Sequence, residues 1–112
     1  MWLFRSKKSL EEEARTLRVD AGKHRLLGQF DAAYRNYKRA YELYVKLGDT
    51  DAQCNVLCSL AETTPGRDEI RGYVEKIEAV CASIPDPDER AKTLRNLDAL
   101  KRRLNDSRGW PS

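Results

Sequence analysis

Residues 28–49 read GQFDAAYRNYKRAYELYVKLGD and hold four of the chain's five tyrosines. Apolar and aromatic side chains recur in this segment at alternating steps of three and four residues: Phe30, Ala33, Tyr37, Ala40, Tyr44 and Leu47. This is the period of one helix face, so we expect a helix from about Phe30 to Leu47. The two alanines allow another helix to approach closely, and large side chains beside them fill the space around the crossing. We therefore interpret the tyrosines mainly as packing residues, with Tyr34 and Tyr41, one position off the face, partly exposed.

Four further helices are predicted on either side of this segment. The first should begin at SLEE, with Ser9 as its cap and Glu12 completing a capping box. A third runs over about 51–62, and a fourth carries apolar residues from Ile70 to Ile84 at helical spacing. In PDPDE, Asp86 is the expected cap of a fifth helix that runs to about Asn105 and presents Ala91, Leu94, Leu97 and Leu104.

The short links between these helices predict that consecutive helices lie antiparallel. We therefore expect an all-α fold of antiparallel helical hairpins with a closing C-terminal helix. Its 112 residues suit one domain. We divide the chain into an apolar and basic segment at 1–8, a helical domain at 9–106 and a tail at 107–112.

Composition narrows the class of protein. The formal net charge of +3 is too small to indicate a polyanion partner by itself, although residues 90–108 carry a local charge of +5. Three cysteines cannot all pair within one chain, which favours a reducing compartment. No apolar run approaches the roughly 20 residues of a membrane span. The opening MWLFRSKK lacks the apolar region of a secretory signal, so we expect a cytoplasmic protein.

Few residues suggest catalysis, a cofactor or a metal. The single histidine, His24, has no neighbour in the sequence that would form a nucleophile–base pair, and the six glycines form no phosphate-binding loop. Cys54, Cys58, Cys81 and His24 could in principle bind zinc, but paired zinc-binding cysteines usually lie in turns. We favour the cysteines as small core residues. The sequence therefore predicts no enzyme, no cofactor and no metal site.

The segment that includes Gly28, Phe30, Ala33, Tyr37 and Ala40 resembles the turn and second helix of the tetratricopeptide repeat (TPR) family. Leu17 and Ala21 match the large and small positions of the preceding helix, so the resemblance covers about residues 14–47. In a second unit, Leu57 and Ala61 take the same roles, but the turn TTPGRD lacks the aromatic residue. The resemblance implies two TPR-like units plus a capping helix. A weaker resemblance is to the MIT domain, a three-helix module.

The TPR resemblance also implies a binding surface, because the first helices of successive units line a groove in that family. On the first predicted helix this places Arg15, Arg18 and Arg25 in the groove, with Asn55 and Glu62 opposite. Arginines pair well with carboxylates, so we expect a peptide or helix of another protein, and an acidic one would suit this surface. A solvated charged face would show the same pattern.

Other partners remain as alternatives. Arg35, Lys38, Arg39 and Lys46 lie among the tyrosines, a combination that can bind RNA or single-stranded nucleic acid, although we favour protein. An MIT-like module would instead bind helical tails of membrane-remodelling proteins. The chain can also form a homo-oligomer that covers a residual apolar face. MWLF can dip into a membrane surface or pack on the fold, and we favour packing.

Overall fold

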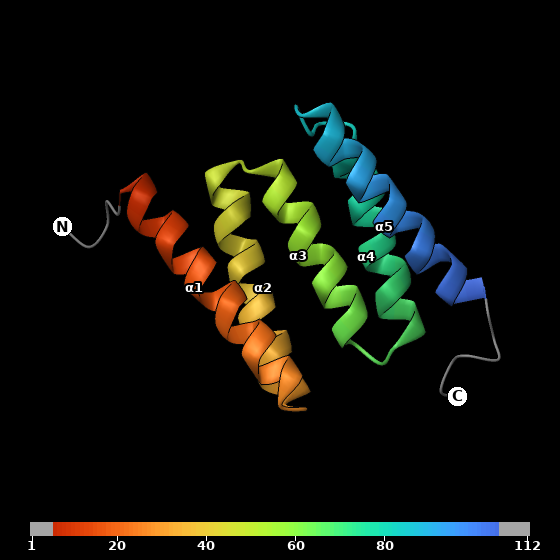
Figure 1. The fold of residues 1–112 in the computed structure, drawn as a ribbon, viewed down its shortest axis with the longest axis horizontal. Coiled ribbons are helices and arrows are strands. Elements are labelled where there is room, and N and C mark those ends of the chain that lie inside the picture. Colours follow the sequence, from red (N-terminus) through yellow and green to blue (C-terminus); the bar gives the residue numbers. More distant parts are fainter. Residues whose placement is uncertain (1–5, 106–112) are drawn as a thin grey trace.

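The computed structural model describes residues 6–105, which form an all-α fold (Figure 1). The helices are α1 (Lys7–Leu26), α2 (Phe30–Leu47), α3 (Thr50–Thr63), α4 (Arg67–Cys81) and α5 (Pro87–Asn105). The predicted fold class is confirmed, and the packing of successive helices is consistent with antiparallel hairpins. The segment MWLF and the tail predicted at 107–112 lie outside the described residues.

Short turns with defined backbone conformations join the helices. Gly28 and Gly48 follow α1 and α2 with φ angles of 75° and 69°. Residues other than glycine rarely adopt this left-handed backbone conformation. Asp49 then caps α3, because its carboxylate accepts a hydrogen bond from the Ala52 amide at 3.0 Å. Because these turns are short, each helix packs antiparallel against the helix before it.

The helices form a row in which α1 and α5 lie at opposite ends and α3 lies in the middle (Figure 1). Each helix packs against the next one along the chain, and α3 also packs against α5. Helix α3 is therefore enclosed by neighbours, and Val56, Leu57 and Leu60 are among its fully buried side chains. The hydrophobic burial of this central helix fixes the positions of the helices around it.

The alanine–tyrosine face of α2, formed by Ala33, Tyr37, Ala40 and Tyr44, is buried as predicted. Both alanines have no exposed surface, and the two tyrosines are 5% and 6% exposed. Helix α1 packs against α2 and contributes Ala14 and Ala21, which are also fully buried, to the same core. Small side chains on both helices thus allow close contact between them, and rings fill the space beside it.

Phe30 is an exception, because it was expected on this face and is 52% exposed. It is the first residue of α2 and follows directly on the turn at Gly28, so it lies at the end of the hairpin. Tyr34 and Tyr41 are partly buried, as their positions beside the face predicted. Their rings lie beneath lysines: Lys38 Nζ is 5.6 Å from the Tyr34 ring centroid, and Lys76 Nζ is 5.8 Å from that of Tyr41.

Two helix details differ from the sequence-based expectation. Helix α1 begins at Lys7 rather than Ser9, because the Ser6 hydroxyl accepts a hydrogen bond from the Ser9 amide and caps the helix earlier. Asp86 does cap α5, since its carboxylate accepts a hydrogen bond from the Asp88 amide. On the inward face of α5, Leu97 and Leu104 are buried as predicted, whereas Ala91 is exposed and Leu94 is 48% exposed. Thr93 and Leu100 are buried in their place.

The close helix contact at the alanine–tyrosine face can be tested with Ala40→Leu. We expect this variant to lower the free energy of unfolding by about 1–3 kcal/mol, because added methylenes in a filled core force neighbours apart. Urea denaturation followed by circular dichroism measures the change. Ala79→Leu on the exposed side of α4 is the matched control and should have almost no effect. Equal effects of the two substitutions would contradict the close packing at Ala40.

Candidate functional site

One hollow on the surface is lined by α1, α3 and α5 together. Its volume is about 440 Å³, and we call it the central hollow. Its lining residues are Glu11, Arg15, Arg18, Tyr44, Asp49, Asp51, Ala52, Asn55, Glu89 and Lys92. Because three helices separated in the sequence contribute to it, the hollow exists only once the whole row of helices has packed.

The core positions part of this lining. Tyr44 is 6% exposed, and the guanidinium carbon of Arg18 lies 5.9 Å from the centroid of its ring. This distance allows a cation–π contact, which orients the Arg18 side chain over a fixed aromatic surface. Arg15, less than one turn away on α1, is exposed and lines the same hollow. The Arg18 guanidinium is therefore held against the core, whereas Arg15 is exposed to solvent.

The structure divides the five predicted partner-binding residues into two groups. Arg15, Arg18 and Asn55 lie together in the central hollow. Arg25 and Glu62 do not line it, and instead form an ion pair between α1 and α3 with 3.0 Å between Nη2 and Oε2. About 10 Å of helix separates Arg18 from Arg25, given the rise of an α-helix. The guanidinium of Arg25 is therefore already paired within the chain.

The charge of the central hollow differs from what the three arginines suggested. Four carboxylates, from Glu11, Asp49, Asp51 and Glu89, face three cations, from Arg15, Arg18 and Lys92. Sequence reasoning missed Glu89 and Lys92, because only the packing of α5 against α3 brings them to this surface. The spacing of Glu89 and Lys92 on one side of α5 was the available signal. The hollow can therefore interact with groups of both signs.

Asp51 is a partly buried carboxyl group in the central hollow. Its Oδ1 atom is buried and has no hydrogen-bond partner among the described residues. Burial raises the pKa of Asp51 above its usual range, and the nearby carboxylates of Glu89 and Asp49 raise it further. The folded chain therefore holds a proton on Asp51 more readily than the unfolded chain does.

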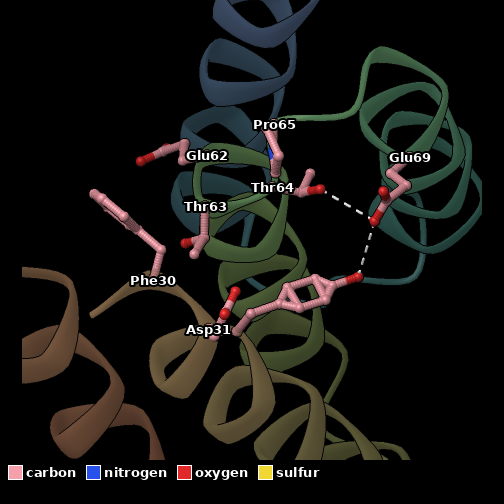
Figure 2. A pocket seen from close by; sticks show the side chains of 8 residues that line it. Phe30, Asp31, Glu62, Thr63, Thr64, Pro65 and Glu69 are labelled. Atoms are coloured by element: carbon pink, nitrogen blue, oxygen red, sulfur yellow. Dashed lines mark hydrogen bonds between the residues drawn. The ribbon is translucent and has the colours of Figure 1, made fainter. Parts of the chain in front are cut away.

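A second hollow, of about 490 Å³, lies where α2 begins and α3 ends (Figure 2). We call it the terminal hollow. Figure 2 shows Phe30 and Asp31 facing the end of α3, with Thr63, Thr64 and Pro65 along the opposite side. It is also lined by Tyr34, Glu62 and Glu69. Aromatic, proline and methyl groups thus alternate with carboxylates in its lining.

A hydrogen-bond network closes one side of the terminal hollow. Glu69 Oε2 accepts hydrogen bonds from the Thr64 hydroxyl at 3.1 Å and from the Tyr34 hydroxyl at 3.3 Å (Figure 2). The Tyr34 and Tyr73 hydroxyls also form a hydrogen bond with each other. The pKa of Tyr73 is raised mainly by its burial and further by this hydrogen bond. The network ties α2 to α4, so this side of the hollow is fixed before any ligand arrives.

The three cysteines are buried in the core, as expected for small packing residues. Burial raises the pKa of the Cys54 thiol to about 11 and that of the Cys58 thiol to about 12. Both thiols are consequently protonated at neutral pH, which makes them poor nucleophiles. Within residues 6–105, no three His, Cys, Asp or Glu side chains are grouped to hold a metal ion.

His24 is half-buried on α1, and its Nδ1 atom lies 2.6 Å from Gln29 Oε1. This hydrogen bond joins the last turn of α1 to the residue before α2. His24 therefore has a structural partner at the hairpin turn.

Comparison of the chain with protein-family models, curated proteins and solved structures found no match. None of the helices in the described part of the chain has the length and apolar character required to cross a bilayer.

The raised pKa of Asp51 predicts a pH dependence of stability. Between the unfolded-state and folded-state pKa values, the folded chain binds more protons, so this group's contribution to stability falls as pH rises through that interval. Asp51→Asn removes the titration. The melting temperature of Asp51→Asn relative to the unmodified chain should therefore be about 1–3 °C higher at pH 7 than at pH 4.

Thermal melts by circular dichroism at several pH values between these limits measure this difference. Glu89→Gln should weaken the same pH dependence, because it removes a negative charge that raises the pKa of Asp51. A pH-independent difference between Asp51→Asn and the unmodified chain would contradict the assignment.

Proposed function

We propose that the chain is a non-catalytic adaptor that binds a peptide or helix of another protein across the central hollow. The observation that carries this proposal is the shared lining of that hollow by α1, α3 and α5. The TPR resemblance implies the same use of first helices, which line the groove in that family. A packed row of helices that presents one continuous polar surface suits recognition of an extended or helical segment.

Side chains that are ordered before binding would reduce the entropic cost of binding a partner. Arg18 already rests on the buried ring of Tyr44, and Asp49 is held as the cap of α3. Side chains that are ordered before binding lose less conformational entropy when a partner arrives. The exposed Arg15 then adds a charged contact at the edge of the surface.

All the charged groups that line the central hollow, and not the arginines alone, indicate which charges the partner segment should carry. The three arginines predicted from the sequence suit an acidic peptide, but carboxylates as well as cations line the hollow. A partner segment with both acidic and basic side chains would pair with both sets. Its carboxylate would bind Arg15 and Arg18, and its lysine or arginine would approach Glu11 or Glu89.

The nucleic-acid alternative has less support from the same geometry. Lys38 lies over Tyr34, so this ring is already covered by a side chain of the chain itself. Arg39 pairs with Glu13, with 3.5 Å between Nη2 and Oε1. A single strand would have to displace these contacts before its bases could stack on the tyrosines.

Selection of peptides from a displayed random library on the immobilised chain tests the proposal. Titration calorimetry then measures the affinity of a selected peptide for the Arg15→Glu/Arg18→Glu variant. We expect the affinity to fall at least about tenfold, because two like-charge contacts replace two ion pairs. Arg71→Glu/Arg95→Glu, with both changes at exposed positions outside the central hollow, is the charge-matched control and should bind normally.

Amide chemical-shift changes in the complex should fall on α1, α3 and α5. Shifts confined to α4, which contributes no residue to the lining, would contradict the assignment of the central hollow as the binding surface. So would selected peptides that bind the arginine variant as tightly as the unmodified chain.

A further inference from the structure

The turn between α1 and α2 exposes an unusual amount of apolar surface. Leu26 is 89% exposed, Leu27 is 72% exposed and Phe30 is 52% exposed. Single exposed apolar residues are common, but three large ones within five positions form a patch of the kind that marks a contact surface. We call this patch, with the last turn of α1, the tip.

The tip lies next to the terminal hollow on the same surface, because Phe30 belongs to both. The terminal hollow has an apolar part formed by Phe30, Tyr34 and Pro65, into which a leucine side chain could fit. The tip does not fill the hollow of its own chain, since Leu26 and Leu27 remain largely in solvent. The surface thus combines a protruding apolar group with an adjacent apolar recess.

The tip and the terminal hollow also differ in charge. The last turn of α1 carries the cations Lys23 and Arg25, whereas the terminal hollow carries the carboxylates Asp31, Glu62 and Glu69. The tip is therefore apolar and basic, and the hollow is apolar and acidic.

Most of these charged groups already have partners. Arg25 pairs with Glu62, and Glu69 accepts two hydrogen bonds. Within residues 6–105, no ion pair involves Lys23 or Asp31. One available charge of each sign thus remains, with the cation on the tip and the carboxylate in the hollow.

We propose that two copies of the chain associate about a two-fold axis, with the tip of each copy against the terminal hollow of the other. A two-fold interface uses the same patch on both copies, so the patch must contain both complementary parts. This patch does, because an apolar and basic protrusion adjoins an apolar and acidic recess. Lys23 of each copy then approaches Asp31 of the other, and the leucines leave water. This association is independent of the function proposed for the central hollow.

Sedimentation velocity of the full chain over about 1–300 µM, a range suited to a small interface, tests the proposal. We expect a monomer–dimer equilibrium that Leu27→Glu weakens at least about tenfold, because each copy then loses a buried leucine and gains a buried charge. Leu94→Glu is the matched control, since Leu94 is also exposed but lines a different surface on α5, and it should dimerise normally. A chain that stays monomeric throughout, and so keeps this patch for a different partner, would overturn the proposal.

Charge exchange gives a second test that does not depend on the leucines. Lys23→Glu and Asp31→Lys should each dimerise weakly alone, because every tip–hollow contact then brings like charges together. An equimolar mixture of the two variants should regain the dimer, since both contacts in the mixed pair join opposite charges. Circular dichroism melts of each variant verify its fold. A mixture that dimerises no better than its components would show that tip and hollow do not meet.

Discussion

The close contact of α1 with α2 is the constraint on which the rest of the structure depends. Buried alanines on both helices allow it, and Tyr37 and Tyr44 fill the space that the alanines leave. The same contact has a consequence on the surface, because the buried Tyr44 ring supports Arg18 in the central hollow. Tyr44 therefore both fills the core and positions a charged group of the central hollow. A change that loosened the helix pair would also release the arginine.

Helix α3 extends this constraint across the molecule. It packs against α2, α4 and α5, and it supplies polar residues to the central hollow and to the terminal hollow. Its two ends have opposite surroundings, since Asp51 lies among carboxylates at the start while Glu62 pairs with Arg25 near the end. The buried, partnerless oxygen of Asp51 costs folding free energy.

The sequence predicted those features that depend on local periodicity. Helix α2 begins and ends where the alternation of Phe30 to Leu47 begins and ends, and Asp86 and Pro87 start α5. Features that depend on how helices cross were not predictable in the same way. Of the inward residues predicted for α5, Leu97 and Leu104 are buried but Ala91 and Leu94 are exposed, because periodicity alone does not show how a helix crosses its neighbours. Glu89 and Lys92 were missed, because the packing of α5 against α3 brings them to the surface. Of the five residues predicted to bind a partner, Arg15, Arg18 and Asn55 line the central hollow, and Arg25 and Glu62 pair with each other outside it.

The exposed leucines at the tip are informative because the fold does not require them. Leu26 ends α1 and Leu27 follows it, and polar residues at both positions would leave the buried core unchanged. Their exposure in the folded chain brings no stabilisation and increases the tendency to aggregate. An apolar pair at such a place is most simply explained by a surface that covers it. In the dimer that we propose, the acidic recess of a second copy covers it, with Asp31 opposite in charge to Lys23.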